Sequence, residues 1–240
     1  MSDTKRHAEL PADLPSLSRL PNFVAHEVPV TAVDAHLPPV APGALLPQAL
    51  RQRFRQPPIW QPELRSEPRF TDRQLAPASV LVPLVMRDEL TLLLTERTAH
   101  LSNHSGQIAF PGGRQDAEDA DAAACALRES QEEIGLDPRH VEVLGNLPTY
   151  TTGTRFVVTP VVALVAPDHR LVLSDHEVAS AFEVPLRFLM DPSNHRWHTV
   201  EVQGVRRDWI SMPWQDGAKQ RFIWGATAGM LRNLYRFLAA

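Results

Sequence analysis

Just past the middle of the chain stands the sequence RESQEEIGL, which occupies residues 128–136. It completes an alanine-rich segment that predicts a helix from about Asp121 to Ile134. Acidic residues precede this segment, Gly135 follows it and Pro138 lies just beyond, as is typical where a helix begins and ends. The charged residues near its end therefore occupy defined positions on a helix.

Three glutamates share one face of this predicted helix. Successive residues are about 100° apart around a helix axis, so Glu133 lies about 40° from Glu129 on one side and Glu132 about 60° on the other. Another face is mostly apolar and can pack on a sheet. Its members are Ala123, Leu127, Ser130 and Ile134. We therefore expect the three carboxylates to be held by a rigid, anchored helix.

Without a cation, this group of carboxylates is electrostatically unfavourable. Like charges at helical spacing repel one another, and the negative end of the helix dipole opposes them as well. A divalent cation would remove both penalties, and oxygen ligands favour Mg²⁺ or Mn²⁺, which commonly also bind substrate phosphates. The lone Cys125 excludes a cysteine-based zinc cluster. The alternative interpretation is a solvated acidic face of ordinary kind.

Composition indicates one globular domain with an extension. The chain has 240 residues, of which 43% are hydrophobic and 22% charged, enough to form a core and to exclude global disorder. Thirteen of the 22 prolines precede residue 78. We therefore expect a proline-rich N-terminal extension over residues 1–77, with a short helical piece at Leu46 to Phe54, and a main domain over residues 78–240.

The main domain has the pattern of a mixed α/β fold. An apolar run from Val80 to Met86 and another from Leu90 to Thr95 predict a β-hairpin, in which Pro83 indicates an edge strand or a bulge. Later segments predict strands at 141–147, 156–165, 197–202 and 220–224, a short helix at 182–190 and a closing helix at 226–238. We expect a central sheet with helices packed on it.

Charge and hydropathy exclude several kinds of partner. The formal net charge is −4, from 24 basic and 28 acidic residues, and no dense basic tract is present, so nucleic acid is not an expected partner. No apolar stretch is long enough to cross a bilayer, and residues 1–10 are polar. We therefore expect a cytoplasmic protein that does not bind membranes.

The segment from Gly113 to Leu136 resembles the Nudix box of the Nudix hydrolases. That motif is a glycine, five residues, a glutamate, seven residues and then Arg-Glu-apolar-any-Glu-Glu-any-Gly-apolar. Here the loop is one residue longer, Asp119 replaces the middle glutamate, and Ser130 stands at the apolar position, where its hydroxyl needs only a backbone carbonyl of the preceding turn. The helical part of the motif keeps its spacing.

This resemblance implies an α/β/α sandwich with a mixed central sheet and a metal-dependent pyrophosphohydrolase. By the resemblance, Glu129 and Glu133 would be the main metal ligands, and Glu132 either a further ligand or the base that activates water. The Gly113 carbonyl is a further candidate ligand. Arg128 would hold a carboxylate in place through bidentate pairing, or else form a plain surface ion pair.

Residues 93–113 also resemble the additional signature of the coenzyme A pyrophosphatases. Arg97, Gly106 and residues 110–113 (FPGG) stand at the signature positions, whereas Ser102 stands where a second arginine belongs. The resemblance implies cleavage of coenzyme A or its thioesters to 3′,5′-ADP and a 4′-phosphopantetheine product. Because a serine cannot supply the charge of an arginine clamp, another nucleoside-diphosphate derivative stays open, such as NADH, ADP-ribose or a diadenosine polyphosphate.

Four residues of this region are candidates for binding the substrate phosphates: Arg97, His104, Gly112 and Gly113. The glycines permit a close approach of the backbone to a phosphate, although such a pair can simply form a turn. Arg97 could instead be a strand-end ion pair, and His104 a hydrogen-bonded loop histidine. Because some Nudix enzymes draw a catalytic glutamate from a distant loop, Glu177 is a candidate here, with a solvated loop acid as its alternative.

The resemblance extends from about Ala78 to Leu238, because residues 182–186 and 223–228 also fit the subfamily. Trp224 in this part could stack on a base or pack in the core. A function of another class stays open, namely a Nudix-fold nucleotide-binding regulator without catalysis. A regulator has no need of three aligned glutamates, which favours the enzyme. The extension leaves a homodimer open.

Overall fold

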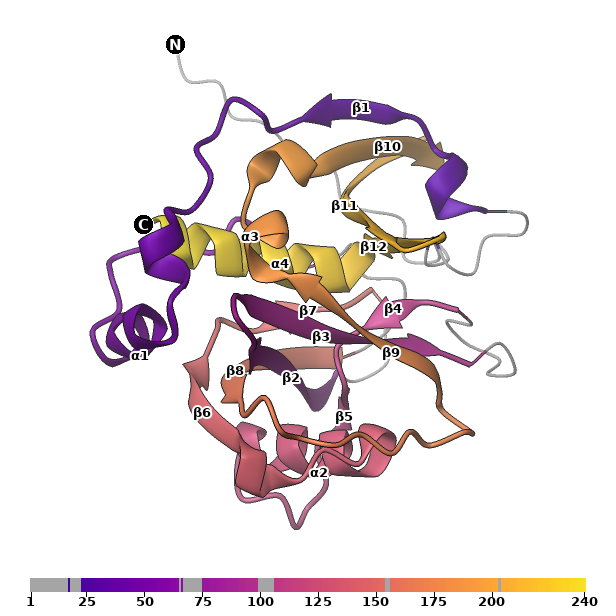
Figure 1. Ribbon diagram of the computed structural model, residues 1–240. Helices are drawn as coiled ribbons and strands as arrows, with labels where there is room; N and C mark the ends of the chain where they lie inside the picture. Colours follow the sequence, from indigo (N-terminus) through magenta and orange to yellow (C-terminus); the bar gives the residue numbers. More distant parts are fainter. Residues whose placement is uncertain are drawn as a thin grey trace.

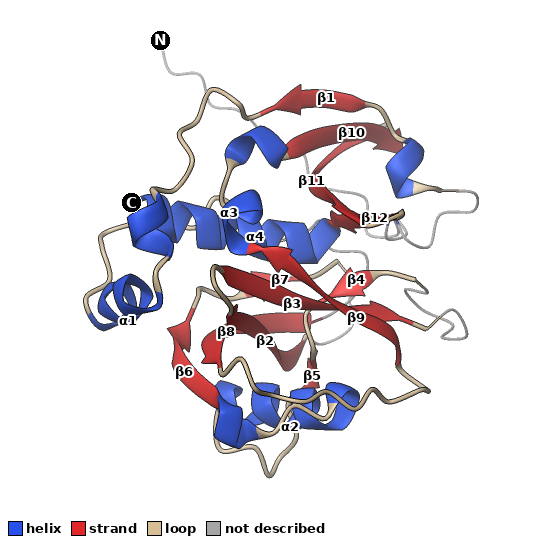
Figure 2. Ribbon diagram, in the orientation of Figure 1, coloured by secondary structure: helices blue, strands red, loops and turns tan. Residues whose placement is uncertain are grey.

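The structure is a computed structural model that describes residues 17, 23–64, 66, 75–98, 106–153, 156–202 and 204–240. Figures 1 and 2 show four layers, which from the top are a small sheet, helix α4 (Gly225–Ala239), a large sheet and helix α2 (Ala122–Ile134). Helices thus cover both faces of the large sheet, so the predicted α/β/α fold is confirmed. The small sheet, beyond α4, is an additional layer that the sequence did not predict.

The large sheet has eight strands in the described residues and is mixed. Its main order is β4-β3-β2-β8-β6, while β5, β7 and β9 pair with β2, β8 and β3. Its strands are β2 (Ala76–Met86), β3 (Leu90–Arg97), β4 (Ile108–Ala109), β5 (Gly112–Arg114), β6 (Val141–Asn146), β7 (Tyr150–Thr151), β8 (Phe156–Val165) and β9 (Val178–Pro185). β2 pairs antiparallel with β3, as the predicted hairpin requires, and parallel with β8.

Pro83 lies in the middle of β2, inside the sheet, so the predicted edge strand or bulge is wrong. The backbone N–H of Leu81 donates to the Pro111 carbonyl, and position 83 faces the same side of the strand. On that side β2 pairs with β5 up to Val80 and with β3 only from Leu84 onward. The missing N–H of Pro83 therefore falls at the point where β2 changes its neighbour.

The small sheet contains one strand from the N-terminal part of the chain and three from the C-terminal part. Its order is β1 (Val30–Val33), β10 (Arg196–Val202), β11 (Val205–Asp216) and β12 (Lys219–Trp224). The sequence predicted β10 and β12 but missed β1 and the long β11. The Asp216-Gly217 pair, a strong hairpin signal, stands between β11 and β12 and could have revealed the missing strand.

The predicted helix at 182–190 is wrong over its first part. Residues up to Pro185 belong to β9, which pairs antiparallel with β3. Phe182 and Val184 are buried on one face of this strand, a spacing of two that fits a strand. Only the short helix α3 (Leu186–Leu189) follows.

Two hydrophobic clusters fill the spaces between layers. One lies between α2 and the large sheet and includes Ala126, Ile134 and Val161. The other lies between the large sheet, α4 and the small sheet, and includes Val82, Leu231 and many further residues. The Nudix-box helix is thus anchored through its apolar side, which leaves its acidic side for the loops.

Residues 23–64 wrap around the main domain. They form η2 (Ala25–Glu27), β1, η3 (Pro42–Leu45) and α1 (Pro47–Arg55), and further short 3-10 helices are η4 (Pro138–His140) and η5 (Pro192–Asn194). Leu45 and Leu50 enter the larger hydrophobic cluster. None of the helices in the described part of the chain combines the length and the apolar character that a bilayer span requires.

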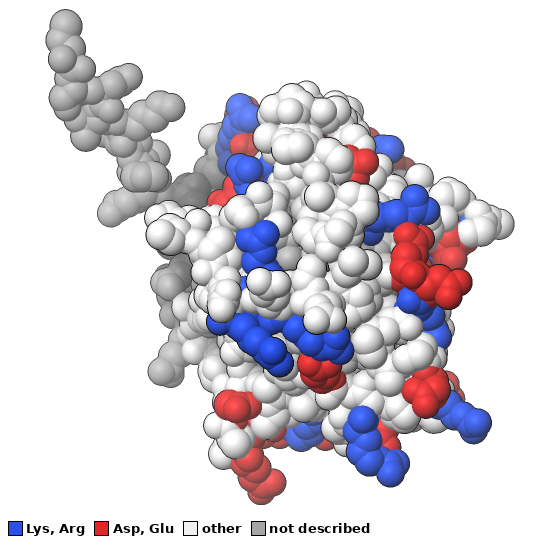
Figure 3. Space-filling model, turned by 60° about the vertical axis from the view of Figure 1, so that its left-hand side comes forward, with Lys and Arg blue, Asp and Glu red and all other residues white. Residues whose placement is uncertain are grey.

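Charged residues of both signs are mixed on the face shown in Figure 3. Among the surface ion pairs of the molecule, the side chains of Arg51 on α1 and Glu142 on β6 are 2.7 Å apart. This face therefore carries both acidic and basic groups, and the sequence has no dense basic tract.

Candidate active site

Helix α2 begins and ends where the sequence predicted. The Asp121 side chain accepts a hydrogen bond from the Ala124 N–H at the N-terminus, and Gly135 adopts a left-handed conformation, with φ of 66°, at the C-terminus. Ser130 is fully buried, and its hydroxyl donates to the Ala126 carbonyl at 2.6 Å. The polar residue at the apolar position of the motif is thus satisfied within the helix, as expected.

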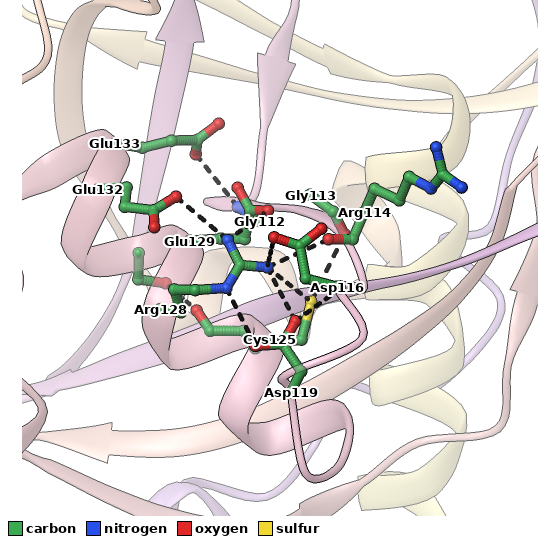
Figure 4. Close-up of polar contacts among 12 residues, drawn as sticks. Gly112, Gly113, Arg114, Asp116, Asp119, Cys125, Arg128, Glu129, Glu132 and Glu133 are labelled. Atoms are coloured by element: carbon green, nitrogen blue, oxygen red, sulfur yellow. Dashed lines mark hydrogen bonds and ion pairs between the residues drawn. The ribbon is translucent and has the colours of Figure 1, made fainter.

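The Gly112–Gly113 pair forms the floor against which two of the glutamates lie (Figure 4). A Cβ atom at Gly113 would come within 2.5–2.6 Å of the carboxylate atoms of Glu129. Gly112 has φ of 153°, and a Cβ there would collide with the backbone of Ser79 and Val80. Its N–H donates to Oε2 of Glu133 at 3.1 Å. Glycine is therefore required at 113 for the backbone to approach Glu129 so closely, and at 112 because of its positive φ and its close contact with β2.

Arg128 joins three acidic side chains (Figure 4). Its Nε and Nη2 donate to the two carboxylate oxygens of Asp119 at 3.0 and 2.8 Å, and its Nη1 donates to Glu129 at 3.0 Å and to Glu132 at 3.1 Å. The hydrogen bonds from Arg128 hold the pKa of Asp119 well below its usual range. Asp119 is therefore the bidentate partner of Arg128 and orients its guanidinium. The guanidinium in turn orients Glu129 and Glu132.

Glu133 is the most deeply buried of the three glutamates. Only 5% of it is exposed, and this burial raises its pKa to about 7, despite the N–H of Gly112 and the charge of Arg97. Nη1 of Arg97 lies 3.8 Å from Oε1 of Glu133. Burial also raises the pKa of Glu129. Both carboxylates would gain from a cation placed between them and the solvent.

Glu177 belongs to the same acidic group, although it comes from the loop before β9. Its negative charge contributes to the raised pKa values of Glu129 and Glu133. Its backbone is tied to the end of β3, because the Thr98 N–H donates to the Glu177 carbonyl at 3.1 Å and the Thr98 hydroxyl donates to the His176 carbonyl at 3.0 Å. Sequence reasoning missed this role of Thr98, since its partners are distant in the chain.

The donors of this cluster suit a hard divalent cation. Glu129, Glu133 and the Gly113 carbonyl offer oxygen ligands, and the desolvation of two glutamates is the penalty that a cation relieves. As the side chains lie, no three Asp, Glu, His or Cys groups of the described residues converge on one point. Glu132 stands apart, because 59% of its side chain is exposed and it pairs with Arg128.

The remaining predicted site residues fall into two groups. Arg97, Gly112, Gly113, Arg128 and Glu177 come together around Glu129 and Glu133, whereas His104 and Ser102 lie outside the described residues. Cys125 is buried below Gly113, where its thiol contacts the Gly113 carbonyl at 3.8 Å. Burial raises the pKa of this thiol, which suits packing rather than nucleophilic chemistry.

Known proteins resemble the chain over this same region. Residues 75–211 match the family model described as NUDIX domain. The protein named Uncharacterized Nudix hydrolase NudL from Enterobacter sp. (strain 638) is 44% identical over 157 residues, which cover 65% of this chain and 80% of that protein. The protein of the same name from Shigella flexneri serotype 5b (strain 8401) is 41% identical over 176 residues, covering 73% and 88%.

Solved structures give a weaker likeness. The crystal structure of a C. elegans Ap4A hydrolase binary complex superimposes with a TM-score of 0.40 and 21% identity, and covers 50% of this chain and 86% of that chain. The sequence matches are stronger, since the domain model spans more than half of the chain and both relatives align over most of their own length. Together with the glutamates of α2, the sequence matches show that this chain belongs to the Nudix hydrolases, enzymes that cleave diphosphate bonds of small nucleotide derivatives and generally use divalent metal ions.

Proposed function

We propose that the protein hydrolyses the diphosphate of coenzyme A or its thioesters, giving 3′,5′-ADP and 4′-phosphopantetheine or its acylated form. The observation that supports this substrate is the position of Arg97 at the end of β3. This arginine belongs to the signature of the coenzyme A pyrophosphatases, and its guanidinium lies 3.8 Å from the buried carboxylate of Glu133. The charge of Arg97 is therefore available beside a candidate metal ligand, where the diphosphate would bind.

Arg97 and the two glycines would bind the diphosphate. About a third of the Arg97 side chain is exposed, so one side of the guanidinium can contact a phosphate while the other faces Glu133. The backbone at Gly112 and Gly113 has no side chain that would keep a phosphate away. His104 is a further candidate for this work.

Glu129, Glu133 and the Gly113 carbonyl would hold the cation, Mg²⁺ or Mn²⁺, with Glu132 as a further ligand or as the base. When bound, such a cation neutralises charge on the diphosphate and lowers the pKa of a bound water. Arg128 keeps Glu129 and Glu132 in position through its hydrogen bonds, and Asp119 keeps Arg128 in position.

Two carboxylates can take the proton from the attacking water. Both are exposed: Glu132 is held by Arg128, and Glu177 lies on the loop before β9, which is hydrogen-bonded to the end of α2 through Ser174 N–H and the Glu133 carbonyl. Glutamine variants of each separate them, because loss of a general base lowers kcat with little change in KM. The variant that lowers kcat and removes the acidic limb of the pH profile identifies the base.

The direct test is incubation of the full chain with coenzyme A, NADH, ADP-ribose and a diadenosine polyphosphate, each with Mg²⁺ or Mn²⁺, and identification of products by mass. We expect the highest kcat/KM for coenzyme A or a thioester. A higher value for another compound would overturn the coenzyme A assignment and agree with Ser102 in place of an arginine. Failure to cleave any of the four would favour a nucleotide-binding regulator.

An arginine variant sharpens this test. Arg97→Gln keeps a polar side chain and removes the charge, so we expect a KM for coenzyme A raised by roughly tenfold, since a charge-assisted hydrogen bond contributes about 1.5–3 kcal/mol. Arg139→Gln is the matched control, because Arg139 is 88% exposed and pairs only locally with Asp137. Equal kinetics of the two variants would contradict the role of Arg97.

A further inference from the structure

A cavity lies on one face of strand β3, and the acidic cluster lies on the other face. Its volume is about 430 Å³, within the usual range for pockets that take small ligands. It is open to solvent on one side and is lined by residues 23–26 of the N-terminal segment, the end of β3, residues 106–108 and β12. Its lining includes the rings of Phe23, His26, Phe222 and Trp224 and the charged groups of Glu96, Lys219 and Arg221.

The rings form one wall of this cavity. Phe222 and Trp224 are two residues apart on β12, so both point to the same face, while Ile223 between them is fully buried in the core. The centroid of the Phe23 ring is 6.0 Å from that of Trp224, and the centroid of the His26 ring is 6.0 Å from that of Phe222. Such a wall offers stacking surface to a planar heterocycle.

The charged groups of the cavity are already neutralised. Oε2 of Glu96 accepts hydrogen bonds from Lys219 and Arg221 at 2.5 Å each and from the Ser180 hydroxyl at 3.0 Å. Arg221 also pairs with Asp216 at 2.8 Å. Two acids therefore balance two bases, so the cavity has no excess positive charge for a phosphate and is better suited to an uncharged polar group.

Glu96 decides what kind of polar group fits. Although burial acts in the opposite direction, the hydrogen bonds from Lys219 and Ser180 hold the pKa of Glu96 below its usual value, so it is ionised and can only accept. Oε2 has three donors, whereas Oε1 receives none of these three. A ligand that brings a single N–H donor suits Oε1, while one that brings two adjacent donors would need both oxygens.

The purine bases differ in the hydrogen-bond donors and acceptors that they would present to Glu96. Adenine presents one amino group beside a ring nitrogen that accepts, guanine presents two adjacent donors beside a carbonyl, and hypoxanthine presents a carbonyl where adenine has its amino group. Held in the orientation of adenine, hypoxanthine would turn its carbonyl toward the ionised carboxylate of Glu96 and its ring N–H toward the ammonium of Lys219. The cation of Lys219, which is about half exposed, lies beside Glu96 and can donate to the ring nitrogen of adenine.

The cavity and the acidic cluster flank the same strand end. Glu96 and Arg97 are consecutive in β3, so their side chains point to opposite faces of the sheet. The Arg97 backbone N–H donates to the Gln107 carbonyl at 3.0 Å, and Gly106 N–H donates to the Arg97 carbonyl at 3.2 Å. Residues that line the cavity are thus hydrogen-bonded directly to the arginine beside Glu133.

We propose that this cavity binds the adenine ring of the substrate, with the ring wall of β12 and residues 23–26 stacking on the base and Oε1 of Glu96 accepting from its amino group. This assignment rests on the proposed adenine-nucleotide substrate and adds the residues that recognise its base. It also gives the N-terminal segment a part in substrate specificity.

The test is titration of the full chain with adenosine, inosine and guanosine 5′-monophosphates, followed by NMR of the tryptophan indole signals. These probes have no diphosphate to cleave, so binding is measured without turnover. We expect the adenosine compound to bind about tenfold more tightly than the other two, as for one hydrogen bond to a charged group, and to shift the Trp224 signal. The Trp224 signal is assigned by its loss in Trp224→Phe.

Two variants then distinguish the contribution of the ring wall to binding from that of the Glu96 carboxylate. Phe222→Ala should weaken binding of all three compounds by about tenfold, because stacking does not depend on the base. Glu96→Gln should remove the preference for adenosine. Glu201→Gln, an exposed acid on β10, is the control and should bind as the wild type does. Equal affinities for the three compounds, or an unchanged preference in Glu96→Gln, would overturn the proposal.

The two proposals can fail separately. If coenzyme A is cleaved but the three monophosphates bind alike, the adenine site is wrong and the proposed function stands. If the adenosine compound binds with the expected preference but none of the diphosphate compounds is cleaved, the adenine site stands and the catalytic function fails. Replacement of Glu96 also removes its ion pairs with Lys219 and Arg221, which could change the cavity itself. The comparison of the wild type with Phe222→Ala tests the ring wall without that complication.

Discussion

Two helices of this protein each carry an arginine that gathers acidic side chains, and the two clusters differ in their balance of charge. On α2, Arg128 contacts Asp119, Glu129 and Glu132, with Glu133 and Glu177 beside them and Arg97 as the second cation. On α4, Arg232 contacts Asp34 at 3.0 Å and Glu63 at 2.8 Å, and Arg236 contacts Glu63 at 2.6 Å.

The pKa values follow this difference. On α2, burial raises the pKa of Glu133 to about 7, and the charges of Glu177 and Glu129 add to this effect. On α4 two bases meet two acids, and although burial acts in the opposite direction, the hydrogen bond from Arg232 keeps the pKa of Glu63 below its usual value. An excess of buried acid is unfavourable for folding unless a cation joins it, whereas in a balanced cluster each charge is compensated and the loss of one partner is costly. The α2 cluster is therefore the candidate for binding a cation, and the α4 cluster ties residues 34 and 63 of the N-terminal segment to the domain.

The largest effect is expected from Glu133→Gln. Loss of a candidate metal ligand should lower kcat/KM by about 10³-fold or more, as for several kcal/mol of transition-state stabilisation. Because the carboxylate is unfavourable when buried, the variant should melt at the same or a higher temperature than the metal-free wild type. Glu118→Gln, an exposed acid before α2, is the control. Full residual activity of Glu133→Gln would refute its role.

Arg232→Met tests the balanced cluster. Only 2% of Arg232 is exposed, so its loss leaves Asp34 and Glu63 poorly compensated and should lower the free energy of unfolding by about 3–5 kcal/mol. The kcat/KM of the folded protein should hardly change. Denaturant unfolding provides the measurement, with Arg139→Met as the control, for which less than about 1 kcal/mol is expected. A variant as stable as the wild type would contradict the stabilising role of this cluster.

Acid should destabilise the protein through His195, which lies in the α4 cluster. Its Nε2 contacts the Leu189 carbonyl at 2.8 Å and its Nδ1 lies 2.9 Å from Nη1 of Arg232, so a proton on Nδ1 would face a cation. Burial lowers the pKa of His195 to about 4. The unfolded chain therefore takes up the proton first, near pH 6.5, and stability that is complete above pH 6.5 is lost as the pH falls toward 4.

This loss amounts to roughly 3 kcal/mol for a shift of about two and a half pKa units. The measurement is the difference between wild type and His195→Gln in the free energy of unfolding at pH values from 7 to 4. We expect the two proteins to converge as the pH falls. Parallel curves would show that this histidine does not titrate as the structure indicates.

The smallest effect is expected from Thr98→Val, which acts on the α2 cluster from a distance. The variant loses the hydroxyl that donates to the His176 carbonyl and so loosens the loop that carries Glu177. We expect kcat to fall by about fivefold, in line with about 1 kcal/mol for one hydrogen bond, with KM nearly unchanged. Thr98→Ser keeps the hydroxyl and should retain activity; equal losses in both variants would contradict this role.

Local pattern was sufficient for elements whose signals lie within the element itself. The predicted helix from about Asp121 to Ile134 agrees with α2, and the predicted strand at 156–165 agrees with β8, because a cap, a glycine stop and an apolar run are contiguous in the chain. The predictions for Pro83 and β9 were wrong because they depend on which strand lies next to each of them, and the local sequence does not contain that information.

The sequence by itself determined the Nudix-box helix, its three aligned glutamates and the glycines before it, because helical periodicity and turn chemistry depend on neighbours in the chain. The tertiary structure alone decided how Arg97 and Glu177 join Glu133, how Thr98 holds the loop, and how residues 23–26 meet β12 around Glu96. These arrangements depend on burial and on contacts between residues far apart in sequence, and both exist only once the layers have packed.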